Sequence, residues 1–177
     1  MTRGRRIALT VLLMLCLFST FLAYGVGKMG FSADLAAVQD IFLGKGSFQI
    51  GLDFRTMLSD EFQVRIPVAC TVKEASFLVE SGIMLVYYPW AQGPFMGLSV
   101  FQAGFSQGSE TLDSLVNLNE VLLGWTFEFG PGLFVEPCLA IRDPSGTFSD
   151  EYSRLKGTFP CYTTFRGRLI FGWCFWR

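Results

Sequence analysis

Residues 47–55 read SFQIGLDFR, and residues 62–73 read FQVRIPVACTVK. Apolar and polar side chains alternate through both segments, and only residues 58–61 separate them with a turn-like stretch. A period of two residues places one set of side chains on each face of a strand. The two segments therefore predict an antiparallel β-hairpin with one apolar face and one polar face.

The same alternation continues along the chain and predicts further strands at 77–89, 94–105, 119–130, 133–143 and 163–176. We expect an eighth strand at 31–43, although a helix over 34–43 is a competing interpretation. Single-chain bacterial barrels contain an even number of strands. No helix of normal length is expected between the strands. The predicted fold class is therefore all-β, an eight-stranded antiparallel up-and-down transmembrane β-barrel.

The apolar face indicates a membrane environment. The sequence is 51% hydrophobic and contains 19 phenylalanines, yet no run beyond the N-terminus matches the roughly 18 apolar residues that a membrane helix needs. The interior of an eight-stranded barrel is just wide enough for side chains. Large aromatic residues therefore belong on the lipid-facing surface, with small and charged residues inside. A soluble, lipocalin-like ligand-binding barrel with the opposite arrangement is an alternative.

Charged residues fall on the face that would point inward. An isolated buried charge is costly, so acids and bases on this face should pair with one another. The predicted interior charge network consists of Asp34, Asp40, Asp53, Arg55, Arg65, Glu80, Glu120, Glu128, Glu136, Arg142, Arg166 and Arg168.

Loop lengths and aromatic residues predict an orientation. If the C-terminus is periplasmic, the short turns at 58–61, 90–93 and 130–132 are periplasmic, and the longer connections at 106–118 and 144–160 are extracellular. Aromatic residues would then gather at the periplasmic interface as a girdle, formed by Tyr87, Tyr88, Trp90, Phe129, Trp173 and Trp176.

The N-terminal residues have the three parts of a secretory signal. Three arginines among the first six residues precede an apolar run over 7–22, and small residues stand at the two positions that a signal peptidase reads. We expect a signal peptide over 1–25, cleaved after Gly25, and a barrel domain over 26–177; an uncleaved anchor helix is the alternative. The expected location is the bacterial outer membrane.

Residue content excludes several functions. There is no histidine, so a Ser–His catalytic pair cannot form, and we expect no enzymatic activity. Without histidine or a CxxC pair, no metal site or other cofactor is expected. Whether any cysteines form a disulfide is left open. The net charge of −1, with no basic cluster after the first six residues, speaks against nucleic-acid binding.

The final strand, with Phe171, Trp173 and Phe175 in alternation before Arg177, resembles the C-terminal signature of outer-membrane barrels. That resemblance implies recognition by the barrel-assembly machinery. More broadly, residues 31–177 resemble the small OmpA-, OmpX- and OmpW-like barrel domains. The resemblance concerns architecture and implies contact with outer-membrane lipids. The expected role is structural or one of surface interaction. The charged and polar loops 106–118 and 144–160 are the candidate surface for an extracellular partner, with ordinary solvated loops as the alternative. A narrow pore for small or apolar solutes is the alternative.

Overall fold

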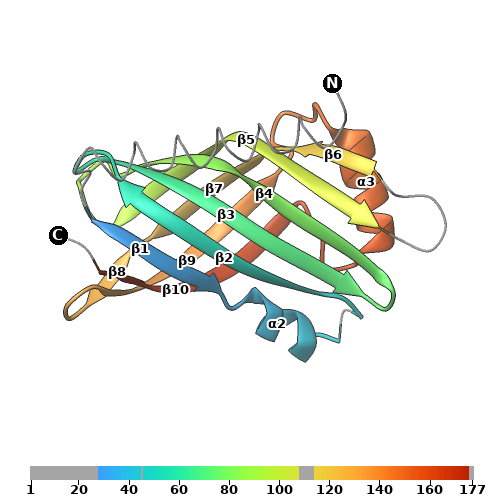
Figure 1. Ribbon diagram of the computed structural model, residues 1–177, viewed down its shortest axis with the longest axis horizontal. Helices are drawn as coiled ribbons and strands as arrows, with labels where there is room; N and C mark the ends of the chain where they lie inside the picture. The colour runs from blue at the N-terminus through green and yellow to red at the C-terminus, as the bar shows by residue number, and fades with distance from the viewer. Residues whose placement is uncertain (1–27, 45, 108–113, 176–177) are drawn as a thin grey trace, which may run out of the picture.

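The protein is an eight-stranded antiparallel β-barrel (Figure 1). A computed structural model describes residues 28–44, 46–107 and 114–175, leaving the predicted signal peptide outside the described residues. Seven of the barrel strands are continuous, and the remaining one, the sixth in chain order, is built from the short segments β6, β7 and β8. In chain order the segments are β1 Met29–Asp34, β2 Phe48–Met57, β3 Phe62–Lys73, β4 Ser76–Tyr87, β5 Pro94–Gln107, β6 Ser114–Leu118, β7 Glu120–Trp125, β8 Phe127–Phe129, β9 Leu133–Arg142 and β10 Phe165–Cys174.

The barrel closes between its first and last strands. β1 pairs antiparallel with both β2 and β10, so that Phe31 lies opposite Phe54 on one side and Trp173 on the other. Every other neighbouring pair is also antiparallel, and successive strands are neighbours around the wall. The predicted up-and-down barrel topology is therefore confirmed.

The sixth barrel strand is interrupted at Asn119 and Thr126. The backbone N–H of Asn119 donates to the Tyr152 hydroxyl at 3.2 Å, and that hydroxyl donates to the Asn119 carbonyl at 2.6 Å. The Thr126 N–H bonds to the Gly93 carbonyl at 2.7 Å, in the turn that precedes β5. These contacts divide the predicted strand at 119–130 into segments without removing it from the barrel wall.

The expected strand at 31–43 is wrong beyond residue 34, where the chain turns into the helix α2, Ala36–Phe42. A carboxylate oxygen of Asp34 accepts the Ala36 N–H at 2.8 Å, and Leu35 donates its N–H to the Leu169 carbonyl. These bonds turn the chain at the barrel rim. The competing helical interpretation is therefore the correct one for most of this segment.

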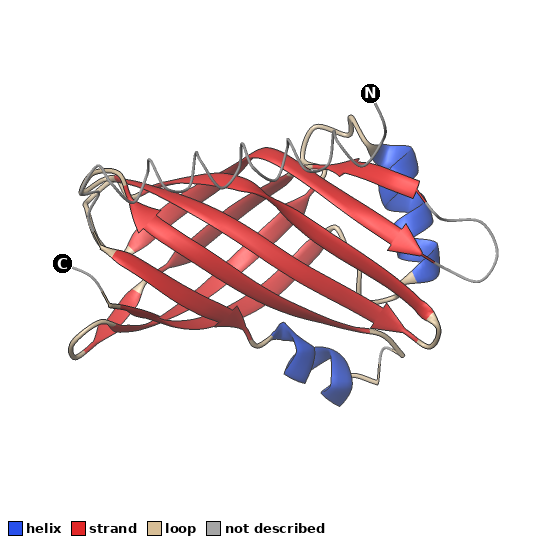
Figure 2. Cartoon of the chain, viewed as in Figure 1, coloured by secondary structure: helices blue, strands red, loops and turns tan. Residues whose placement is uncertain are grey.

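A second helix, α3 Ser149–Thr158, lies in the connection between β9 and β10, where only a loop was expected. Figure 2 shows α2 and α3 at the same end of the barrel. The expected loop at 106–118 is shorter than predicted, because β5 continues to Gln107 and β6 begins at Ser114. No helix within the described residues is long and apolar enough to cross a membrane.

Candidate functional site

The barrel wall separates two kinds of side chain. Buried and exposed residues alternate along the strands, most regularly in β4 and β9. Among the described strand residues, no Asp, Glu, Lys or Arg occupies an outward-facing position. Most outward positions instead carry apolar side chains, including Leu52 at 59% exposure and Val100 at 68%. The chemically active groups of the wall therefore lie inside, where the candidate site must be.

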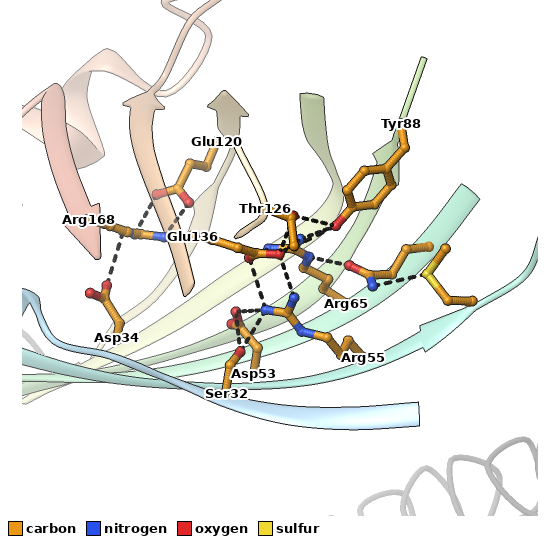
Figure 3. Close-up of polar contacts among 12 residues, drawn as sticks. Ser32, Asp34, Asp53, Arg55, Arg65, Tyr88, Glu120, Thr126, Glu136 and Arg168 are labelled. Atoms are coloured by element: carbon orange, nitrogen blue, oxygen red, sulfur yellow. Dashed lines mark hydrogen bonds and ion pairs between the residues drawn. The ribbon is translucent and has the colours of Figure 1, made fainter. Parts of the chain in front are cut away.

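Glu136 lies at the centre of the first interior cluster (Figure 3). It comes from β9 and accepts hydrogen bonds from Arg55 on β2 at 2.8 Å and from Arg65 on β3 at 2.9 Å. The Thr126 hydroxyl donates to the same carboxylate at 2.8 Å. Both arginines and Glu136 are fully buried. Three barrel strands are thus joined across the interior through a single carboxylate.

Aromatic rings lie beneath both guanidinium groups. Arg55 lies 4.2 Å from the ring centre of Phe134, and Arg65 lies 4.7 Å from that of Phe95. These rings belong to an apolar cluster that fills the interior beside the charges, formed by Met84, Val86, Tyr88, Phe95, Leu122, Phe134, Cys138, Ala140 and Ile170. The expectation of an interior built from small and charged residues is therefore incomplete.

A second cluster is centred on Glu120. Its carboxylate accepts two hydrogen bonds from Arg168, at 2.9 and 2.8 Å, and lies 3.4 Å from Nε of Arg142. Arg168 also contacts Asp34 at 3.3 Å (Figure 3). Arg142 donates to the side chain of Gln49 at 2.8 Å. Glu120 therefore links β7 to both β9 and β10.

The other predicted network residues are distributed around these two clusters. Glu80 accepts hydrogen bonds from Gln49 at 2.9 Å and from the Tyr162 hydroxyl at 2.7 Å. Asp40 pairs with Arg166, which also donates to the Cys161 carbonyl at 2.7 Å.

Asp53 lies near Arg55, at 3.6 Å. Glu128 departs from the prediction, because it is exposed at one end of the barrel and not in the buried network. The short β8 carries it beyond the packed interior.

The barrel end that carries α3 is closed by apolar packing. Tyr152, Leu155, Phe159 and Tyr162 pack against the inward side chains of β4 and β6, which are Leu78, Val116 and Leu118. The Tyr162 ring also lies 3.8 Å from the Arg142 guanidinium. Burial raises the pKa of both Tyr152 and Tyr162 above the ordinary value.

Sequence reasoning missed this plug, although a usable signal was present. Tyr152, Leu155 and Phe159 recur at intervals of three and four residues, the spacing that brings side chains to one face of a helix.

The opposite end is open. A vestibule of about 1020 Å³ extends inward from it to Arg55 and Glu136, with Trp90 and Trp125 among its walls. Farther along the interior, a cavity of about 30 Å³ lies between Glu80, Glu120 and Arg168. That second volume is about the size of one water molecule. The interior charges and apolar residues therefore separate the vestibule from the plugged end.

The structure places the residues of the predicted aromatic girdle in different surroundings. Trp90, Phe129 and Trp173 are exposed at the open end, and Tyr87 lies on the outward face of β4. Tyr88 is instead 5% exposed, and its hydroxyl accepts a hydrogen bond from Arg65 at 2.9 Å. Adjacent strand residues point to opposite faces, so Tyr87 and Tyr88 cannot share one. Trp176 lies outside the described residues.

Sequence reasoning omitted further exposed aromatic residues near this end, which are Phe31, Phe62, Trp125, Phe127 and Phe175. Several of them contact one another or the predicted girdle residues. Phe31 stacks with Phe175, and the Phe62 ring packs against Tyr87.

The described residues contain no cluster of side chains suited to holding a metal ion. Within the same residues, the thiols of Cys70, Cys138, Cys161 and Cys174 are free. Comparison with known proteins finds no matching family model, curated protein or solved structure.

Proposed function

We propose that this protein is an integral outer-membrane β-barrel with a structural or surface-interaction role and no catalysis. The observation that carries the proposal is the uncharged, apolar outward surface of the described strands. Soluble monomers rarely expose contiguous apolar patches larger than a few hundred Å². A bilayer solvates such a surface, and the closed barrel satisfies the backbone hydrogen bonds that lipid cannot satisfy.

The proposed orientation places the helices outside the cell. The open end carries the short turns around 58–61, 88–93 and 130–132, as the periplasmic end of a bacterial barrel does. Exposed Trp90 and Trp173 lie at this end, and amphipathic aromatic rings favour the membrane–water interface. The connection that contains α3 is then extracellular.

A structural role is favoured over transport because the interior is filled. Arg55, Arg65 and Glu136 bind one another across the barrel, and the α3 end is plugged by apolar side chains. The runner-up function is a narrow pore for small or apolar solutes. The vestibule of about 1020 Å³ favours that alternative, since it leads into the barrel from the periplasmic side.

The proposed partners follow from the exposed parts of the protein. Exposed polar residues of α3, among them Asp150, Ser153 and Arg154, offer a surface to an extracellular partner. The outward aromatic residues of β10 are suited to recognition by the barrel-assembly machinery, as the resemblance to outer-membrane barrels implies. The absence of catalysis is proposed because a sequence without histidine cannot form the Ser–His pair of lipid-modifying barrels.

Fractionation and gel mobility test the proposed membrane location. Expressed in a Gram-negative host with its N-terminal segment, the protein should sediment with outer membranes and resist extraction by salt and alkali. The unheated protein should migrate differently from the boiled protein on a detergent gel. A mature protein that stays soluble and monomeric without detergent would support the lipocalin-like alternative and overturn the proposal.

A further inference from the structure

The helix α2 projects from the barrel rim between β1 and β2 (Figure 1). Its inner side is tied to the wall through Asp40, which is 2% exposed. The Asp40 carboxylate pairs with Arg166 on β10 and accepts the Gln49 N–H on β2 at 3.2 Å. Ala36 is buried on the same side. These contacts fix which face of the helix points away from the barrel.

The outer face of α2 is exposed and largely apolar, with Gln39 as the one exposed polar residue of the helix. Val38 is 50% exposed and Phe42 is 86% exposed, and Leu35 continues the same stripe at 43%. The intervals of three and four residues place these side chains on one helix face, opposite Asp40. Ile41 and Leu43 extend the exposed apolar surface at 67% and 60%. The helix has therefore turned its only charged side chain inward and its apolar side chains outward.

This surface adjoins the outward face of the barrel wall. α2 packs beside β2 and β10, whose outward residues include the exposed Ile50, Phe165 and Leu169. The Leu35 N–H bonds to the carbonyl of Leu169, so the start of the helix is attached directly to that face. The apolar surface of the wall thus continues without a charged boundary onto the helix.

The size of α2 argues for lipid as the occupant of its outer face. A seven-residue helix is about 10 Å long, at about 1.5 Å per residue. A stable protein interface buries roughly 800 Å² on each partner, which so short a helix cannot supply alone. An apolar helix face at the boundary of a bilayer needs no partner of matching shape.

We propose that α2 is an interfacial anchor that inserts Leu35, Val38, Ile41 and Phe42 into the outer leaflet and holds the extracellular rim at a set depth. The inference rests on the proposed outer-membrane location and adds a specific lipid-contacting element outside the strands. Pairing of Asp40 with Arg166 orients the helix, because it holds the polar side of α2 against the barrel.

Site-directed spin labelling in lipid vesicles tests the anchor. All five cysteines are replaced by alanine, and single cysteines are introduced as Phe42→Cys, Leu52→Cys and Ser153→Cys. Leu52 marks the middle of the outward β2 face, and Ser153 is an exposed position on α3. The label at 42 should be several-fold more accessible to oxygen than to a water-soluble nickel complex, with a depth between those of the other two labels.

Any other outcome of the spin-label measurement overturns the proposal that α2 is an interfacial anchor. A label at 42 that behaves like the label at 153 places α2 in water. Low accessibility of the label to both oxygen and the nickel complex means that protein covers the helix, either a second copy or another segment of this chain. If the label at 52 also lies in water, the outer-membrane proposal fails as well. A label at 52 in lipid with a label at 42 in water overturns only the anchor.

A second variant covers the case in which the cysteine-free protein does not fold. Phe42→Trp in the otherwise unchanged protein adds an indole at the helix end, whereas the native Trp90, Trp125 and Trp173 lie at the opposite end of the barrel. The added emission should be quenched in vesicles of lipid brominated near the headgroup. Emission that such lipid leaves unquenched overturns the anchor.

Discussion

Glu136 shows how a single carboxylate stabilises a closed barrel. Its two oxygens accept hydrogen bonds from Arg55 and Arg65, which come from neighbouring strands on the far side of the interior. Both arginines are buried, so loss of this partner leaves their guanidinium charges poorly compensated. The free energy of the network therefore depends on every member being present.

Replacing Glu136 with glutamine should destabilise the barrel strongly. The substitution keeps the side-chain shape but leaves Arg55 and Arg65 without their shared counter-charge. Breaking a buried pair costs about 3–5 kcal/mol. The loss is measured as the free energy of unfolding in urea, with the protein in lipid vesicles. Glu128→Gln is the matched control, because Glu128 is exposed, and a change beyond about 0.5 kcal/mol there would contradict our assignment of its position.

Tyr152 and Tyr162 should make the plugged end sensitive to alkali. Burial raises the pKa of both residues, so the folded protein keeps their protons where the unfolded chain loses them. Their contribution to stability is complete below the ordinary pKa of 10.0 and falls as the pH rises above it.

The free energy of unfolding, measured between about pH 8 and about pH 11, should therefore decrease. Tyr152→Phe and Tyr162→Phe should each make that decrease smaller. Tyr87→Phe, on the outward face of β4, serves as the control. An equal decrease in all four proteins would rule out the two plug tyrosines as its cause.

The strands carry different kinds of side chain on their two faces. In β2, outward Leu52 is exposed, whereas inward Arg55 is buried in the charge network. The sequence alternation that makes a strand recognisable also sorts its side chains between the barrel interior and the surroundings. Lipid on the outside makes a charge costly there, while water would tolerate it.

Leu52→Arg tests that difference at the middle of a strand. An outward arginine at the bilayer midplane costs about 2–4 kcal/mol, falling to about 0–1 kcal/mol near the interface. The control is Gln107→Arg, at the exposed end of β5. Unfolding in vesicles should show a much larger loss for residue 52 than for residue 107. Equal, small effects at both positions are the expected behaviour of a soluble barrel.

At the scale of the whole molecule, the barrel is closed at one end and filled in its middle. Leu155 of α3 and Tyr162, which follows α3, pack into the mouth of the barrel at that end, and the Glu120 and Glu136 clusters occupy the interior beyond it. The open vestibule reaches inward as far as Arg55 and Glu136. This arrangement agrees with the proposed structural role.

Planar bilayers test whether the molecule conducts. The reconstituted protein should give no channel events under an applied voltage, because an eight-stranded barrel filled by side chains leaves no aqueous path. A wide porin incorporated under the same conditions is the positive control. Reproducible small conductance steps from the folded protein would favour the runner-up function of a narrow pore.

Local periodicity was enough to predict the barrel and most of its interior network. Alternation places Arg55, Arg65 and Glu136 on inward faces whatever their partners are, because strand geometry depends on neighbouring residues. The same rule separates Tyr87 from Tyr88, a distinction that the expected girdle overlooked.

Only the tertiary structure decided how these inward residues pair and where regular strands stop. The Asp40 side chain would point inward in a strand and also points inward in α2. At the rim, where the chain is helical, it pairs with Arg166, which lies far along the chain. Tyr152 interrupts the sixth strand at Asn119 in the same way, through contacts made across the fold. Such choices depend on groups distant in sequence, so periodicity alone carries no information about them.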